Sequence, residues 1–297
     1  MSPETPDVLH RTRPMYWSVQ REFWENRSLY LAPLVVDGFV LFGFLLSMIT
    51  LPRKIRALQE LDAWQQSLTV SRPFSVLATV LILSTFVIAA FYCLDALHSE
   101  RRDRSILFWK SLPVSDRTTV LAKASIPVVV LPLLVVALII VTQWIMLLLS
   151  TAVLLMNGVD PAAFWKQLPF VQMSVALVYG VIVHTLWYAP IYAWLLLISA
   201  WARRVALLWA ALPLLVALIV ESIALGTSHT ADVVRYRLFG AMTEAFNFNA
   251  PGKSAVLRLS QLDPVRFLTS PGLWSGLILA AVFLTLAIRL RRDREPM

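Results

Sequence analysis

Apolar residues gather in six long stretches of the chain, separated by shorter segments that carry most of the charge. A window of about 19 residues, which suits a membrane span, finds these stretches at 31–51, 73–95, 124–156, 168–201, 205–225 and 272–290. Each is long enough to cross a bilayer as a helix, which takes about 20 apolar residues. The pattern predicts an all-α polytopic membrane protein, one domain over 1–297, with six transmembrane helices and both termini on one side.

The third and fourth stretches, 124–156 and 168–201, are longer than a bilayer requires. At about 1.5 Å per residue each helix would measure about 50 Å, against a hydrocarbon core of about 30 Å. We therefore expect these helices to tilt, to project from the membrane or to bend. Pro127, Pro132 and Pro190 are the places where a bend is predicted.

The composition supports a membrane protein and narrows its function. Hydrophobic residues make up 58% of the chain and charged residues 15%, and the mean hydropathy is +0.70. Soluble domains average about 45–50% apolar and about 25% charged residues. Six spans leave too little polar chain for a large catalytic domain. The single cysteine, Cys93, excludes an internal disulfide and a multi-cysteine metal site, and residues 1–28 lack the apolar core of a signal peptide.

Basic residues lie unevenly on the two sides that six spans define. Sixteen of the 26 Lys and Arg fall on the side of the termini, and five of the other ten lie in the long segment 226–267, which weighs little in such a count. Arg53, Lys54 and Arg56 run against the bias. The distribution predicts a multi-pass inner-membrane protein with cytoplasmic termini. It accounts for the net charge of +8 without a nucleic-acid partner.

An amphipathic segment, MYWSVQREFWEN at 15–26, precedes the first span. A helix here has an aromatic face and a polar face, which carry Tyr16, Trp17, Val19, Phe23 and Trp24 on one side and Ser18, Arg21, Glu22 and Glu25 on the other. Such a helix is too short and too charged to span, so it lies flat among the lipid headgroups with its aromatic rings inserted. It is either a surface anchor or an elbow, over 15–28, that transmits motion to the first span.

The segment between the second and third spans, 98–123, combines dense charge with an apolar run. Residues 100–104 alternate in sign, which predicts a solvated helical extension with internal ion pairs. Ile106, Leu107, Phe108 and Trp109 follow, and then Pro113 ends the helix before Ser115 or Asp116 caps the next one. Four large apolar residues in a polar loop need a surface to bury them. They either dip into the membrane or fill a groove on a partner protein.

These segments resemble those of the permease subunits of ABC-2-type transporters, the transmembrane subunits of type V ABC exporters. The likeness lies in DALHSERRDRSILFWKSLPVSDRTTVLAK at 95–123, in REFWENRS at 21–28 and in the ending SPGLW…LRRDRE. The resemblance also covers most of the chain in its layout, which consists of an elbow helix, six spans and a large outer loop before the last span. The resemblance implies a homodimer, or a heterodimer with a similar permease, bound to two copies of a cytoplasmic ABC ATPase.

In that family the loop between spans two and three forms a coupling helix that docks into a cleft on the ATPase, and 105–113 matches its place. By resemblance, Phe108 and Trp109 are the hydrophobic plug, and Arg101, Arg102 and Lys110 pair with acidic residues on the rim of the ATPase cleft. The resemblance implies this set of coupling residues: Glu100, Arg101, Arg102, Ser105, Phe108, Trp109, Lys110, Leu112 and Pro113. It also implies short extracytoplasmic helices over 226–267, a segment that could otherwise be a solvated connector.

Motifs for catalysis are missing from the sequence. It contains no G-x-x-x-x-G-K-[ST] phosphate loop, and its nine glycines are scattered. It also has no H-E-x-x-H and no G-x-S-x-G motif. We expect a non-catalytic subunit without a cofactor of its own, with ATP and Mg held by the partner ATPase.

Three ionisable residues lie inside predicted spans, where a charge costs about 2.5–3.5 kcal/mol at the bilayer centre. They are Asp37, His184 and Glu221. Each either packs structurally, lines a polar pathway or takes part in a proton relay. The main rival to an ATP-driven exporter is therefore a proton-coupled secondary transporter that uses these three residues, and a third class is a membrane sensor or scaffold without transport.

Overall fold

The computed structural model describes residues 14–57, 62–102, 114–247 and 259–293. Its regular elements are helices, joined by turns and by one isolated bridge between Phe246 and Leu262. The elements in chain order are α1 Pro14–Glu25, α2 Ser28–Met48, α3 Leu51–Ala57, α4 Ala63–Asp95, α5 His98–Arg102, α7 Asp116–Ser125, the π-helix η3 Ile126–Val130, α8 Leu131–Met156, α9 Ala162–Gln167, α10 Phe170–Trp201, α11 Ala206–Ala224, α12 His229–Ala245, the 3₁₀-helix η4 Leu259–Gln261, α13 Pro264–Thr269 and α14 Pro271–Asp293. The predicted all-α fold is confirmed.

Six helical stretches in the described part of the chain are long and apolar enough to cross a membrane. They are Ser28–Met48, Gln65–Arg102, Asp116–Met156, Phe164–Trp201, Ala206–Ala224 and Pro271–Asp293. Each coincides with one of the predicted spans, so the chain is a multi-pass helical membrane protein. Several stretches extend past the apolar window, because polar residues at the water boundary continue the helix.

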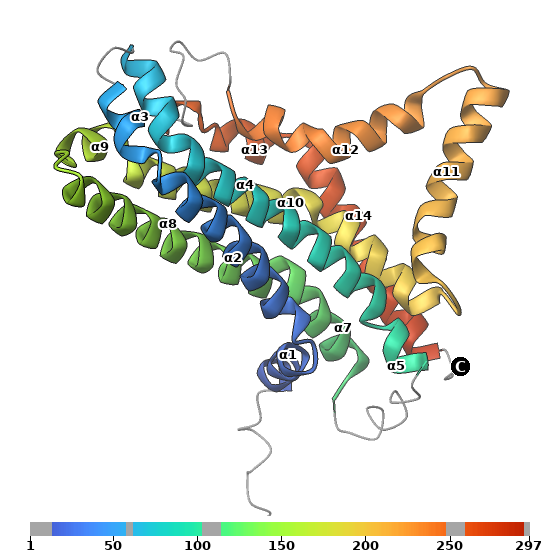
Figure 1. Ribbon diagram of the computed structural model, residues 1–297. Helices are drawn as coiled ribbons and strands as arrows, with labels where there is room; N and C mark the ends of the chain where they lie inside the picture. Colours follow the sequence, from blue (N-terminus) through green and yellow to red (C-terminus); the bar gives the residue numbers. More distant parts are fainter. Residues whose placement is uncertain (1–13, 58–61, 103–113, 248–258, 294–297) are drawn as a thin grey trace, which may run out of the picture.

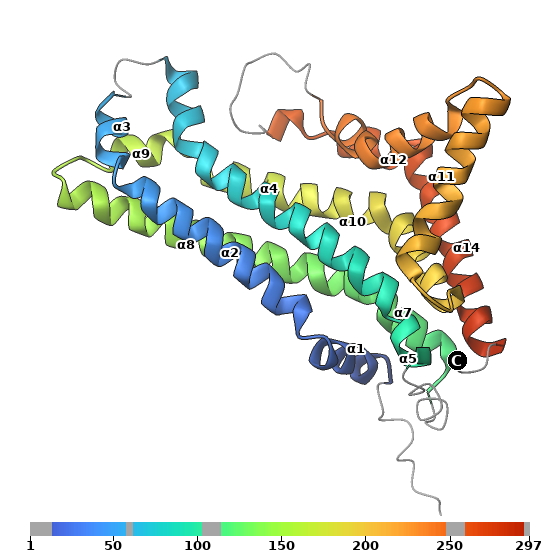
Figure 2. The same ribbon diagram turned by 45° about the vertical axis from the view of Figure 1, so that its right-hand side comes forward.

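The two ends of the helix bundle hold different elements (Figure 1). The near end contains α1, α5, α7 and the last turn of α14, and the far end contains α3, α9, α12 and α13. The chain enters and leaves at the near end, as six crossings require. Figure 2 shows the same division from a second direction, and Figure 1 shows α11 rising from the near end to the far end apart from the other spans.

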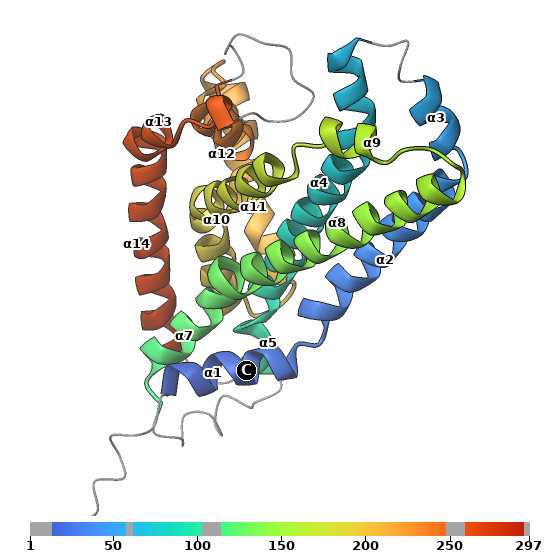
Figure 3. The same cartoon turned by 90° about the vertical axis from the view of Figure 1, so that its left-hand side faces the viewer.

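The central helix is α10, which packs against α4 and α8 on one side and along α14 on the other. Its apolar window is 61% buried, whereas that of α11 is only 11% buried. The helices α2, α4 and α8 form a layer that runs obliquely to α14 (Figure 3), with Leu77, Leu81 and Ile139 fully buried in its core.

Two predicted irregularities of the third span appear at its beginning. The π-helix η3 includes Pro127, which has no backbone N–H to give to a regular helical ladder. Pro132 falls in the first turn of α8, where the missing donor costs little. Before them, the Ser115 hydroxyl accepts a hydrogen bond from the Thr118 N–H at 3.1 Å, so Ser115 is the residue that caps α7.

Between the last two spans the chain forms the helices α12 and α13 (Figure 1). The prediction of short helices over 226–267 is confirmed for the described residues of that segment, and residues 248–258 lie outside them. Helix α12 packs on α10, with Ala245 and Phe246 buried beside Trp187 of α10. Helix α12 therefore covers α10 at the far end of the bundle.

Candidate functional site

Helix α1 has the two faces that its sequence predicts. Tyr16, Trp17 and Trp24 are exposed, by 57%, 58% and 64%. Ser18 and Glu22, on the opposite face, are buried, because α1 packs on α7. The aromatic face is thus free to enter lipid headgroups, while the polar face belongs to the protein interior. A buried carboxylate at Glu22 requires partners, and the neighbouring helices supply them.

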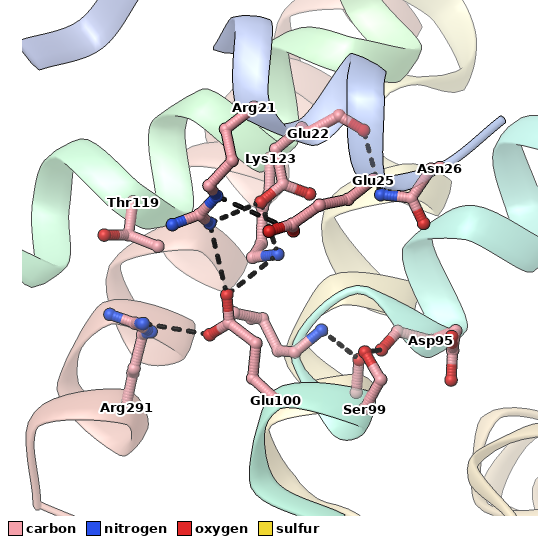
Figure 4. A network of polar contacts seen from close by, with 12 residues as sticks. Arg21, Glu22, Glu25, Asn26, Asp95, Ser99, Glu100, Thr119, Lys123 and Arg291 are labelled. Atoms are coloured by element: carbon pink, nitrogen blue, oxygen red, sulfur yellow. Dashed lines mark hydrogen bonds and ion pairs between the residues drawn. The ribbon is translucent and has the colours of Figure 1, made fainter. Parts of the chain in front are cut away.

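Glu22 accepts hydrogen bonds at both of its carboxylate oxygens. Its Oε1 lies 2.8 Å from the Lys123 Nζ of α7 and 2.7 Å from the Arg21 Nη2. Its Oε2 accepts the Tyr92 hydroxyl of α4 at 2.9 Å. One glutamate therefore connects α1 to α7 and to the end of the second span, and Figure 4 shows Glu22 beside Lys123 and Arg21.

Glu100 of α5 holds the second half of the cluster (Figure 4). Its Oε1 lies 3.1 Å from Lys123 Nζ, and its Oε2 accepts from the Arg291 Nη2 of α14 at 2.9 Å. The other nitrogen of that guanidinium, Nη1, donates to Asp116 Oδ1 at 2.8 Å. We call this cluster the near-end network; its members are Arg21, Glu22, Tyr92, Glu100, Asp116, Lys123 and Arg291.

The near-end network balances its charges, since its three carboxylates face three cations. The exposed fraction is 1% for Glu22 and 3% for Lys123, so water solvates these groups poorly. Burying ions costs several kcal/mol each, and only close, hydrogen-bonded partners offset that cost. The members therefore depend on one another, and the loss of any central member leaves an unpaired charge in the interior.

Two neighbouring carboxylates respond differently to this environment. Burial alone would raise the pKa of Glu22, but the cations of Lys123 and Arg21 outweigh it and hold the pKa below the ordinary 4.5. The pKa of Glu25 is instead raised, because burial raises it more than Arg21 lowers it. Burial opposes the charge of Arg21, yet Glu22, Glu25 and Glu100 keep the pKa of its guanidinium raised. The arrangement thus favours the ionised form of Glu22.

The junction of α4 and α5 is also tied to the end of α10. The Ser199 hydroxyl accepts hydrogen bonds from the backbone N–H groups of Leu97 and His98, both at 2.9 Å. Arg101 is 4% exposed and donates to the carbonyl oxygen of Ala200. The second, third, fourth and sixth spans therefore meet at this end.

This geometry corrects the prediction of a solvated extension for Glu100 and Arg101, while residues 103 and 104 lie outside the described residues. Glu100 and Arg101 are buried, and they have partners on α1, α7, α10 and α14. Arg101 was expected to face an ATPase, but its guanidinium is in contact with α10. Arg102 is exposed, as its expected role requires. The remaining predicted coupling residues, Ser105, Phe108, Trp109, Lys110, Leu112 and Pro113, lie outside the described residues.

Sequence reasoning missed Lys123, Arg291 and Tyr92 as site residues. Lys123 and Arg291 are two of the sixteen Lys and Arg on the side of the termini. A count of charges by side does not distinguish a buried cation from an exposed one. Their position offers a weak signal, because each lies at the boundary between a long apolar stretch and charged chain.

The three ionisable residues predicted inside spans have separate surroundings. Asp37 Oδ2 accepts from the Thr142 hydroxyl at 2.9 Å, which joins α2 to α8. Glu221, near the end of α11, accepts from the His229 and Thr230 N–H groups at 2.6 and 2.7 Å. A carboxylate in this position caps the positive end of α12. The structure therefore gives Glu221 a structural role in the link between α11 and α12.

His184 of α10 lines a cavity of about 570 Å³ between α4, α10 and α12. Its Nε2 lies 3.3 Å from the Tyr192 hydroxyl, and its ring contacts Phe86 and Tyr188. Gln143 of α8 also lines this mainly apolar cavity. Of the three intramembrane ionisable residues, His184 is the one that the described structure places on the wall of a cavity of ligand size.

At the far end, Arg237 holds α12 against the bundle. Its guanidinium donates to the carbonyl oxygens of Trp187 in α10 at 3.1 Å and of Gly272 in α14 at 3.0 Å. It also stacks on the Trp187 ring, with Cζ 4.8 Å from the ring centroid. The Trp187 indole N–H donates back to the Arg237 carbonyl at 2.8 Å. We call these contacts the far-end clamp.

No family model, curated protein or solved structure matches this chain. Within the described ranges, no group of three or more His, Cys, Asp or Glu side chains could hold a metal ion. Two features stand out in the described part of the chain, namely the buried near-end network and the far-end clamp.

Proposed function

We propose that the chain is the permease subunit of an ATP-driven exporter of the ABC-2 type, which moves a substrate across the inner membrane with ATP hydrolysed by a separate subunit. The observation that carries the proposal is the ion pair between Glu100 and Lys123, at 3.1 Å. Glu100 lies just before the segment 103–113 and Lys123 lies after it. The pair joins the two flanks of the segment that resembles a coupling helix.

The contacts around this ion pair would transmit a force on segment 103–113 to the neighbouring helices. Lys123 connects the flanks to α1 through Glu22, and Arg291 connects them to α14 through Glu100. Ser199 connects the first flank to α10. A displacement of 103–113 would therefore move α1 and the second, third, fourth and sixth spans together, because paired buried charges separate only at a high cost.

The proposal places the near end in the cytoplasm, on the side with sixteen Lys and Arg. Two copies of an ABC ATPase would bind there, one on each permease of a homodimer or heterodimer. When ATP closes the ATPase pair, each coupling segment is pushed and the near end moves as one body, which opens an outward path. ATP and Mg stay on the ATPase, and this chain contributes no catalytic residue.

The test is association with the ATPase. A variant carrying Phe108→Ala and Trp109→Ala should insert normally but lose the ATPase during detergent purification and lose transport. The matched control carries Phe239→Ala and Trp274→Ala, which remove two exposed aromatic rings at the far end and should leave the complex intact. Retention of the ATPase and undiminished transport in the Phe108/Trp109 variant would overturn the assignment.

One observation favours the second candidate, a proton-coupled transporter. Asp37 is a buried carboxylate within a span, and its Oδ1 has no hydrogen-bond partner in the described structure. A proton on that oxygen would remove the cost of burying a charge. Transport driven by a pH gradient without ATP, and abolished by Asp37→Asn, would support this candidate. Transport that requires ATP and survives Asp37→Asn would support the exporter.

A further inference from the structure

A second cavity, of about 520 Å³, lies at the far end between α2, α3, α4 and α8. Its wall is mainly apolar and includes Val40, Phe44 and Met146. Two cations, Lys54 of α3 and Arg72 of α4, also line it, and both are exposed. No described carboxylate forms an ion pair with either of them. The cavity therefore combines apolar space with uncompensated positive charge.

The apolar part of this cavity reaches the outer surface of the bundle. Gly43 of α2 and Val76 of α4 line it and are exposed, Val76 by 47%. A side chain added at Gly43 would meet nothing within 4 Å, which confirms that there is room beside this glycine. A shallower hollow of about 280 Å³ continues along α4 past Ser75, Thr79 and Val80, and Arg72 borders both hollows.

The depth of the two cations matches a lipid headgroup. Arg72 immediately precedes Pro73, where the apolar window of the second span begins, and α3 follows directly after the first span. A cation at that level faces phosphate groups, while the apolar surface below it faces acyl chains. Cations placed between transmembrane helices bind anionic headgroups, and Arg matches phosphate geometry especially well.

We infer that this cavity binds an anionic phospholipid, with the phosphate between Lys54 and Arg72 and one acyl chain in the apolar space beside Gly43 and Val76. The site does not depend on the proposed transport function. It also gives a reason for Lys54, one of the three cations that run against the charge bias of the chain, since a bound anion neutralises it.

The experiment uses the purified full-length protein in detergent, with phosphatidylglycerol and phosphatidylcholine as probes and intact-complex mass spectrometry as the readout. Phosphatidylglycerol should remain bound after detergent washing, and phosphatidylcholine should not. Lys54→Gln with Arg72→Gln should weaken phosphatidylglycerol binding about thirtyfold, from the loss of two cations. The matched control, Arg53→Gln with Lys166→Gln, removes the same charge from exposed far-end positions that do not line the cavity and should have no effect.

A second variant tests the apolar half of the site. Gly43→Leu fills the space beside α2 and keeps both cations, so it should also reduce bound phosphatidylglycerol. Inorganic phosphate, a headgroup anion without chains, should not displace the lipid. Equal retention of the two lipids, equal losses in the Lys54/Arg72 variant and its control, full retention in Gly43→Leu, or displacement by phosphate would each overturn the proposal.

Discussion

The near end and the far end of the bundle are held together in different ways. At the near end, charges from α1, α5, α7 and α14 are paired in one buried network. At the far end, Arg237 attaches α12 to α10 and α14 through carbonyl oxygens and an aromatic ring. The members of this network share partners, so breaking one ion pair weakens the others. Arg237 is one of several contacts that hold α12, together with hydrogen bonds from Tyr179 and Tyr188 and the apolar cluster around Trp187.

This difference suits two roles in the proposed transporter. The near end would receive force from a partner, so it must not deform. Its network meets this requirement because it joins the flanks of 103–113 to four spans. A part that opens a path must move relative to the bundle, and in this account that part is α12, which Arg237 and the apolar contacts around Trp187 hold on α10. The predictions below separate the two ends.

The largest effect is expected from Lys123→Met, which removes the cation shared by Glu22 and Glu100. Two buried carboxylates would lose their common partner, so the variant should be about 3–5 kcal/mol less stable. Thermal unfolding in detergent measures this. Lys166→Met, at an exposed position in α9, is the control and should behave like the parent protein. Equal stability of the two variants would show that the network does not hold the near end.

A smaller and more local effect is expected from Arg237→Gln, which weakens the far-end clamp. Loss of two charged hydrogen bonds and of the contact with Trp187 should cost about 2–3 kcal/mol. Hydrogen exchange should rise in α12 and stay unchanged in α7. Arg235→Gln, at an exposed position on the same helix, should leave both helices protected. Faster exchange in α7 as well would contradict the independence of the two ends.

A glycine pair tests the same clamp without changing a charge. A Cβ at Gly276 would collide with the Arg237 guanidinium, whereas a Cβ at Gly38 would meet nothing within 4 Å. Gly276→Ala should therefore destabilise the docking of α12 by about 1–2 kcal/mol, and Gly38→Ala should be neutral or slightly stabilising. Thermal unfolding and hydrogen exchange in α12 provide the measurement. A neutral Gly276→Ala would mean that Arg237 is not held in this position.

The smallest effect is a pH dependence of the near end. The pKa of Glu22 is held below its ordinary 4.5, so the folded protein binds fewer protons here than the unfolded chain. Its stabilising effect is complete above about pH 4.5 and is lost as the pH falls through the lowered value. Melting temperature measured from pH 7 downward should fall less steeply below pH 4.5 in Glu22→Gln than in the parent protein. Parallel curves would argue against an ionised Glu22.

Much of the fold could be predicted from the sequence because spans and amphipathic helices are local patterns. The apolar windows located all six spanning helices, and the alternation of faces in 15–26 located α1. The near-end network could not be predicted, because its pairs are far apart in the sequence: Glu100 and Arg291 are separated by 191 residues. Alternating charges at 100–104 suit local pairing equally well, and only the packing of α5 against α7, α10 and α14 decides the partners.

The central claim is that the near end moves as one body when force reaches 103–113. It is tested by spin labels at the exposed positions Asp95, Arg117 and Asp293, at the near ends of the second, third and sixth spans, with a fourth label at Asp160 beyond the far end of α8. Distances would be measured in the proposed complex with an ABC ATPase, with and without ATP. The distances among the three near-end labels should stay constant while those to Asp160 change. Separation of the near-end labels from one another on ATP binding would contradict the claim.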